Sequence, residues 1–337
     1  MTCGRLLAAI AAIMAVGAWA AVHAQDVPAL SLPVDCAMGS ACYVQQYFDH
    51  DPGPGAVDYA CGPLAYDGHD GTDIRTRTLA EMREGVPVLA AAPGVVLETR
   101  DEMEDVSVAD IGRDALQGRD AGNAVGINHG GGWFTQYSHL MKGSVSVHVG
   151  ERVEAGQVLG MIGLSGNTEF PHVEFSVQHD GKDIDPFVGE AAGYACGDAR
   201  APLWTADAAA ALTYVPGGAL QAGFAGGAAD YRDAREGAYD GFVLEGDTPA
   251  LVFWAEFFGV RRHDRIRLRL EFPDDYDTIQ DTVSMSRDRA QQFQFVGRRR
   301  PDLGWPTGVY RGEAQLLRTI DGVEQVVAAM TEAIELR

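Results

Sequence analysis

Three short segments of the sequence carry side chains that can bind one divalent metal ion together. The first is His69-Asp70-Gly71-Thr72-Asp73, an HxGxD arrangement, which alone is weak evidence because His and Asp beside Gly are ordinary turn residues. The second contains His139, and the third contains His172 and Glu174. Imidazole nitrogens and carboxylate oxygens are the ligands of hydrolytic zinc sites. The sequence therefore offers a candidate metal centre assembled from distant segments.

The third segment, Pro171-His172-Val173-Glu174-Phe175, has the pattern of a strand with one polar and one apolar face. Alternate residues of a strand share a face, so His172 and Glu174 should project on one side. Val173 and Phe175 should turn to the core on the other side. One face of this strand is therefore expected to present an imidazole beside a carboxylate.

Short apolar runs separated by glycine predict an antiparallel β domain that would position these residues. The expected strands are Val86–Leu89, Gly94–Thr99, Ala124–Asn128, Trp133–Leu140, Val158–Ile162 and His172–Gln178. An acidic, non-periodic insert at 100–122 interrupts them. A loop this long inside a compact sheet domain is either disordered or part of a binding rim, and both alternatives stay open.

A second β domain is expected after an Ala- and Gly-rich stretch at 202–227, which is a linker or contains the first strands of that domain. The expected strands are Phe242–Leu244, Ala250–Phe258, Arg265–Phe272, Ala290–Val296, Gly308–Leu317 and Val326–Leu336. The alternation from Arg265 to Leu270 indicates a strand with one buried face. These strands predict a small β-sandwich for the C-terminal part of the chain. With the antiparallel β domain before it, the predicted fold class is all-β.

The first 24 residues have the order of a secretory signal peptide. Arg5 precedes an apolar stretch from Leu6 to Ala21, and Val22-His23-Ala24 supplies a small-residue cleavage site. An uncleaved anchor is disfavoured because the stretch is rich in Ala and Gly and only weakly hydrophobic. The mature protein is expected to be periplasmic or secreted.

Cysteine usage agrees with export. Cys3 leaves with the signal peptide, and the remaining Cys36, Cys42, Cys61 and Cys196 form an even set that should be paired in an oxidising space. Three connectivities are open. The short Cys36 to Cys42 loop favours pairing these two, which leaves Cys61 with Cys196, and the lack of CxxC spacing disfavours a tetracysteine zinc site.

The formal net charge of -22 excludes a nucleic-acid partner, because a protein that neutralises phosphates needs a basic face. One C-terminal region is basic, the run Arg298–Arg300. With the aromatic residues Phe253, Trp254, Phe257 and Phe258 it forms either a docking surface for an anionic glycan or protein, or a sandwich core with a solvated arginine edge. The core is the favoured interpretation.

The ordered motifs resemble peptidase family M23, the LytM or lysostaphin-type metallopeptidases, from roughly Tyr66 to Phe187. That family carries HxGxD, then Tyr-x-His-Leu, then a Gly-rich approach to a Pro-His-x-His strand. The corresponding stretches here are His69–Asp73, Tyr137–Leu140 and Gly163–Phe175. The resemblance implies a LytM-like peptidase domain at 61–200. With the patterns described above, the expected organisation is a signal peptide at 1–24, a disulfide-containing segment at 25–60, this peptidase domain, and a C-terminal β-sandwich accessory domain at 201–337.

The resemblance implies that His69, Asp73 and residue 174 bind zinc, and that His139 and His172 assist catalysis, with the acid and base roles left open. Residue 174 is a glutamate where the family has a histidine. Coordination stays feasible because glutamate oxygen binds zinc at a distance close to that of imidazole nitrogen. The added negative charge should make the activated water less acidic and loosen the preference for zinc over manganese or iron.

The implied function is a metal-dependent endopeptidase that hydrolyses peptide bonds of peptidoglycan. The alternative is a catalytically impaired LytM-like scaffold or activator of another cell-wall hydrolase, bound through the C-terminal domain. Tyr137 is expected to be a buried structural residue. The remaining histidines are expected in solvated loops, namely His50, His129, His148, His179 and His263.

Overall fold

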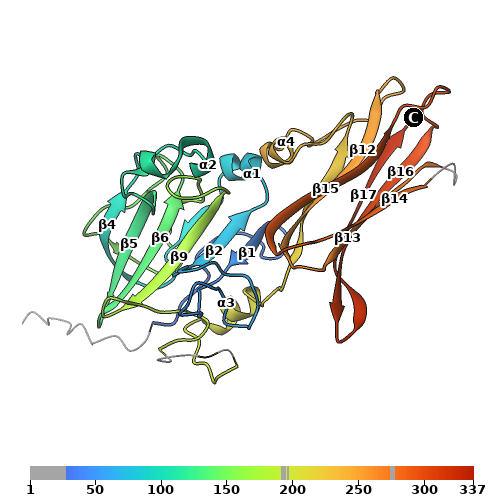
Figure 1. Ribbon diagram of the computed structural model, residues 1–337. Coiled ribbons are helices and arrows are strands. Elements are labelled where there is room, and N and C mark those ends of the chain that lie inside the picture. Colours follow the sequence, from blue (N-terminus) through green and yellow to red (C-terminus); the bar gives the residue numbers. More distant parts are fainter. Residues whose placement is uncertain (1–27, 191–194, 196, 274–277) are drawn as a thin grey trace, which may run out of the picture.

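A computed structural model describes residues 28–190, 195, 197–273 and 278–337 (Figure 1). The signal peptide expected at 1–24 and the predicted Cys61–Cys196 disulfide lie outside the described residues, the latter because of Cys196. Within the described ranges, no helix has both the length and the apolarity needed to cross a bilayer.

An antiparallel, eight-stranded sheet forms the N-terminal half, with the strand order β1-β2-β9-β6-β5-β4-β7 and with β10 paired to β9. Its strands are β1 (Cys42–Gln46), β2 (Thr72–Thr76), β4 (Gly94–Arg100), β5 (Asn123–Gly130), β6 (Trp133–Leu140), β7 (Arg152–Val153), β9 (His172–His179) and β10 (Lys182–Asp183). Strands β3 (Pro87–Leu89) and β8 (Val158–Met161) form a separate pair. This sheet places β2, β9 and β6 side by side.

Short helices lie at the edges of the sheets (Figure 1). They are α1 (Leu79–Glu84), α2 (Val108–Ile111), the 3-10 helix η1 (Arg113–Leu116), α3 (Ala206–Ala211) and α4 (Tyr231–Glu236). Helix α1 begins with a capping box, in which the Thr78 side chain accepts a hydrogen bond from the Glu81 N–H while the Glu81 carboxylate accepts one from the Thr78 N–H. This cap fixes the chain as it leaves β2.

Two antiparallel sheets form the C-terminal sandwich, with strand orders β11-β12-β15 and β14-β13-β16-β17. The strands are β11 (Gly218–Ala225), β12 (Ala250–Val260), β13 (Arg265–Glu271), β14 (Thr278–Ser284), β15 (Arg289–Arg299), β16 (Gly308–Ile320) and β17 (Val323–Leu336). Along β13, Ile266, Leu268 and Leu270 are buried while the arginines between them are not. The all-β prediction is confirmed.

Strand predictions succeeded where apolar residues alternate or cluster, and failed elsewhere. Strand β2 was missed because its sequence, Thr72–Thr76, is polar, although all five residues are buried between β1 and β9. The predicted strand Phe242–Leu244 is wrong, because this segment is irregular. Leu244 still packs into the sandwich core, so its apolar character reflects burial in a loop.

The structure confirms the disulfide between Cys36 and Cys42. In the C-terminal region it supports the core interpretation over the docking surface. Phe253, Phe257 and Phe258 are almost fully buried. The arginine run lies at the end of β15, where Arg300 donates a hydrogen bond to the backbone oxygen of Gly246.

The buried Tyr137 joins the sheet to the segment beside it. Its hydroxyl accepts a hydrogen bond of 2.7 Å from the Ala91 N–H, and burial raises the pKa of Tyr137 to about 12. The hydrogen bond to Ala91 agrees with the structural role that the sequence predicts for Tyr137.

We predict that Tyr137→Phe lowers the free energy of unfolding by about 1–3 kcal/mol, because it leaves the Ala91 N–H buried without an acceptor. Urea denaturation of the full chain measures this change. Tyr43→Phe is the matched control: the Tyr43 hydroxyl bonds to the Ser40 oxygen at the surface, so its loss should cost less than about 0.5 kcal/mol. Equal effects of the two substitutions would contradict the role given to Tyr137.

Candidate metal centre

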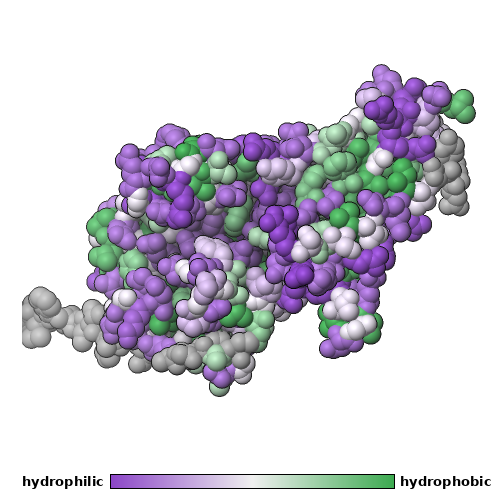
Figure 2. Space-filling view, viewed as in Figure 1, coloured by the Kyte–Doolittle hydropathy of each residue, from purple (hydrophilic) through white to green (hydrophobic). Residues whose placement is uncertain are grey.

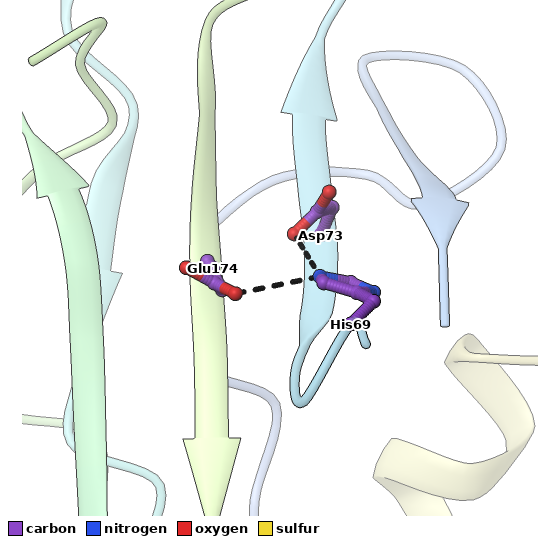
Figure 3. A group of neighbouring side chains, drawn as sticks. All are labelled: His69, Asp73 and Glu174. Atoms are coloured by element: carbon purple, nitrogen blue, oxygen red, sulfur yellow. Dashed lines mark hydrogen bonds and ion pairs between the residues drawn. The ribbon is translucent and has the colours of Figure 1, made fainter. Parts of the chain in front are cut away.

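Strands β2, β9 and β6 bring the candidate residues onto one face of the sheet. Asp73 of β2 lies directly opposite Glu174 of β9, and Glu174 lies opposite Ser138 of β6, next to His139. His69 precedes β2 in the connecting loop and points back to the same place (Figure 3). As expected, Val173 and Phe175 are fully buried on the other face of β9.

His69, Asp73 and Glu174 converge on one point. The Nε2 atom of His69 lies 3.1 Å from Asp73 Oδ1 and 3.4 Å from Glu174 Oε1 (Figure 3). One potential ligand atom from each residue lies within 4.8 Å of the others. The three residues that the sequence predicts as ligands therefore lie together.

The two predicted catalytic histidines lie beside these three residues. The rings of His139 and His172 have centroids 4.7 Å apart. Nε2 of His139 is 3.2 Å from Glu174 Oε2, and Nε2 of His172 is 3.5 Å from Asp73 Oδ1. All five predicted site residues thus form one cluster, in which Glu174 contacts both His69 and His139.

Backbone carbonyl groups orient the three imidazoles. Each Nδ1 atom lies within hydrogen-bond distance of a carbonyl oxygen, His69 at 2.7 Å from Tyr47, His139 at 2.7 Å from Ser165 and His172 at 2.9 Å from Phe170. An Nδ1–H that donates to a carbonyl leaves Nε2 to face the centre. Sequence reasoning missed these partners, because a backbone carbonyl has no side-chain signature.

His139 also has an unusual backbone conformation. Its φ is 62°, in the left-handed region that non-glycine residues seldom adopt. Its N–H donates to the Ala121 oxygen at 2.8 Å, at the end of the acidic insert. Strained backbone of this kind occurs where the surroundings fix a side chain for function.

Asp73 and Glu174 place two carboxylates opposite each other, and both are largely buried. Like charges in this arrangement destabilise a sheet unless positive charge balances them. Burial opposes the charged form of His69, but the two carboxylates outweigh it and raise its pKa to about 11. Burial likewise opposes protonation of His139, but its bond to Glu174 raises its pKa.

The pKa of His172 is shifted in the opposite direction to that of His139. Burial lowers the pKa of His172 to about 4, and the charge of Asp73 only partly offsets that effect. The pKa values of the two predicted catalytic histidines are therefore shifted in opposite directions within one cluster.

The donor set fits a divalent cation. The carboxylate oxygens of Asp73 and Glu174 need positive charge between them, and the anchored ring of His69 directs Nε2 to the same point. Imidazole nitrogen and carboxylate oxygen both bind zinc at similar distances, and a set with two carboxylates also suits manganese or iron.

A cleft of about 1310 Å³ opens over the centre, and His139, His172 and Asp73 lie in its wall. Figure 2 shows mostly hydrophilic surface between the two halves of the molecule. Residues 105–110 of the acidic insert form part of the rim. Asp105 holds the insert in place by accepting hydrogen bonds from the Leu164 and Lys142 N–H groups at 2.8 and 2.9 Å. Because these hydrogen bonds hold the insert against the sheet domain, they favour the interpretation as a binding rim over that as a disordered loop.

Three of the histidines expected in solvated loops are not there. His50 bonds to Asp185 at 2.7 Å with its side chain only 9% exposed, and His179 ends strand β9 and stacks on Trp133 with ring centroids 4.2 Å apart. His129 was expected in a solvated loop, but it is buried in β5, where its ring bonds to the Pro93 oxygen and to Thr135 Oγ1. It is a structural core histidine.

A residue without a predicted role, Tyr66, stacks on His69 with ring centroids 4.4 Å apart and is 51% exposed in the cleft. Its position three residues before His69 was the available signal.

We predict that Glu174→Ala removes about one metal ion per chain, because two of the three donors remain and cannot fill a tetrahedral site. Elemental analysis of purified native and variant proteins measures the loss. Glu98→Ala, in the exposed part of β4, is the matched control and should keep its metal. Equal metal content in all three proteins would remove Glu174 from the site.

Part of the chain is similar to known proteins. Residues 67–186 match the sequence profile of peptidase family M23. Peptidoglycan DD-endopeptidase ShyA of Vibrio cholerae is 31% identical over 117 residues, which is 35% of this chain and 22% of ShyA. Cell division protein DipM of Caulobacter vibrioides is 27% identical over 124 residues, 35% of this chain and 17% of DipM. The match therefore spans less than a quarter of either relative.

Among solved structures, a zinc-containing peptidase from Vibrio cholerae is 25% identical, with a TM-score of 0.32, over 47% of this chain and 39% of that chain. The catalytic domain of the M23 protein EnpA from Enterococcus faecalis is 23% identical, with a TM-score of 0.31, over 44% of this chain and 91% of that domain. The sequence match therefore identifies residues 67–186 as similar to peptidase family M23.

Proposed function

We propose that this protein is an exported, metal-dependent endopeptidase that hydrolyses peptide bonds of peptidoglycan. The observation that carries the proposal is the convergence of His69, Asp73 and Glu174 beside two further histidines in an open cleft. Its relatives support the substrate class, because one is named a peptidoglycan DD-endopeptidase and another a DD-carboxypeptidase/endopeptidase, Mpg of Neisseria.

His69, Asp73 and Glu174 are the proposed ligands of zinc. When bound, zinc would polarise the peptide carbonyl and activate water for hydrolysis. Asp73 and Glu174 supply two negative charges from neighbouring strands, and His69 is held by the Tyr47 carbonyl so that its Nε2 faces them. The rigid sheet preorganises all three donors.

His139 and His172 are the proposed catalytic pair. Their Nδ1 atoms are engaged by the carbonyls of Ser165 and Phe170, so that only Nε2 of each ring can exchange a proton in the cleft. In peptide hydrolysis one such group takes a proton from water and another gives a proton to the leaving amine. Two adjacent rings whose pKa values are shifted in opposite directions suit this pair of tasks.

Export and location remain part of the proposal. The signal-peptide pattern at 1–24 and the confirmed Cys36–Cys42 disulfide both support an oxidising compartment outside the cytoplasm. Peptidoglycan lies in that compartment. The division into a peptidase domain at 61–200 and an accessory domain at 201–337 is proposed with it.

One observation favours the alternative, a catalytically impaired LytM-like scaffold or activator. The Glu174 carboxylate contacts both His69 and His139, so these histidines can balance its charge themselves. The hydrogen bonds from His139 and His69 outweigh burial and hold the pKa of Glu174 well below its usual range. A partner hydrolase would then bind elsewhere, for instance through the C-terminal sandwich.

We predict that the native protein releases new amine termini from purified peptidoglycan in a metal-dependent way. We further predict that Glu174→His is at least as active, because an imidazole restores the family's donor set and removes a negative charge from it. Chromatography of the digestion products, with zinc, manganese or iron added after chelation, measures both activities.

His139→Ala is the inactive control, and metal content is measured for every variant because His and Glu differ in reach. Cleavage by the Glu174→His variant but not by the native protein would show that glutamate at ligand position 174 makes the native protein inactive. No cleavage by either protein with metal bound would favour the scaffold or activator.

A further inference from the structure

Both halves of the molecule form the cleft over the candidate metal centre. One wall belongs to the eight-stranded sheet and its loops, and the other consists of helix α4 and the first residues of β15. Two contacts fix the walls relative to each other: Arg83 pairs with Glu236 at 2.7 Å, and Gln291 donates to Gln45 Oε1 at 2.7 Å. Figure 1 shows α1 and α4 side by side at this boundary.

The wall from the C-terminal sandwich carries two arginines that form no ion pair within the described residues. Arg235 is paired with the buried Glu256 at 3.2 Å. Arg232 and Arg289 are exposed in the same wall, and neither has a carboxylate partner in the part of the chain that the structure describes. The Arg232 guanidinium bonds to the hydroxyl of its neighbour Tyr231 and lies over its ring, and the charge of Asp110 also acts on it. In a chain of net charge -22, two such arginines facing one cleft offer a site for an anion.

The opposite wall has the opposite charge. Asp110 of α2 and Glu169 of the loop before β9 line the cleft. Neither forms an ion pair among the described residues, although the charge of Asp110 acts on Arg232. The cleft is therefore acidic on the side of the metal centre and basic on the side of the sandwich. Walls of this kind are complementary to a ligand that carries an amine at one end and a carboxylate at the other.

Two unpaired acceptors also line the cleft. Within the described residues, the side-chain oxygens of Gln46 and Gln291 are buried and have no hydrogen-bond partner. Gln46 is only 8% exposed and lies opposite Asp73 in the strand pairing, whereas Gln291 is two residues from Arg289 on β15. A buried acceptor without a donor is unfavourable, so N–H groups of a ligand at this boundary would stabilise it.

We propose that the wall formed by α4 and β15 is a recognition subsite for the substrate, in which Arg232 and Arg289 bind a carboxylate of a zwitterionic peptide. The inference rests on the proposed function and specifies its substrate as a peptide with a free carboxylate. Guanidinium groups form charge-assisted hydrogen bonds with carboxylates, and the amine of the peptide would lie toward Asp110 and Glu169.

Binding without turnover tests this subsite separately from catalysis. The probe is a synthetic cross-linked stem peptide, used with its C-terminal carboxylates free or amidated, and titrated calorimetrically into the full chain carrying His139→Ala in zinc buffer. Amidation should weaken binding about tenfold with the arginines present, as expected for a lost charge-assisted contact. In the double variant Arg232→Gln/Arg289→Gln, the free acid should bind as weakly as the amide, so that amidation has no further effect.

Two further variants separate charge recognition from structure. Arg299→Gln, at the other end of β15, should keep the preference for the free acid, and so should Arg289→Lys, which retains the charge. A preference that survives in the double variant would overturn the subsite while leaving the proposed function intact. If neither the free acid nor the amidated peptide binds the His139→Ala parent, the proposed function is overturned and the subsite with it.

Discussion

The site depends on one electrostatic constraint, the opposition of the Asp73 and Glu174 carboxylates on neighbouring strands. Two carboxylates this close and this buried are stable only with positive charge between them. Two sources are within reach, a divalent cation or the protonated rings of His69 and His139. Whether the protein is a hydrolase or a scaffold depends on which of these sources balances the charge.

The rest of the structure restricts how that balance can be reached. The sheet fixes both carboxylates by backbone pairing, and backbone carbonyls fix the imidazoles at Nδ1. The acidic insert and the C-terminal sandwich then enclose the centre in a cleft with walls of opposite charge. The proposed catalytic groups and the proposed recognition groups therefore come from different halves of the chain.

The sequence predicted the site residues better than the elements that hold them. The spacing of His172 and Glu174 indicates a shared strand face directly, because the period of a strand is two. Strand β2 was not predicted, because the strand pattern relies on apolar residues and Thr72–Thr76 is a mostly polar strand buried inside a sheet. The partners of the imidazoles and the wall from β15 could not be foreseen, since they depend on backbone atoms and on the packing of two distant segments.

The most direct test of the account is a crystal structure of the native protein grown with zinc and measured at the zinc absorption edge. The account predicts one anomalous peak at about 2.0–2.2 Å from His69 Nε2 and from a carboxylate oxygen of both Asp73 and Glu174. The absence of a peak, with Glu174 still paired to His69 and His139, would contradict it.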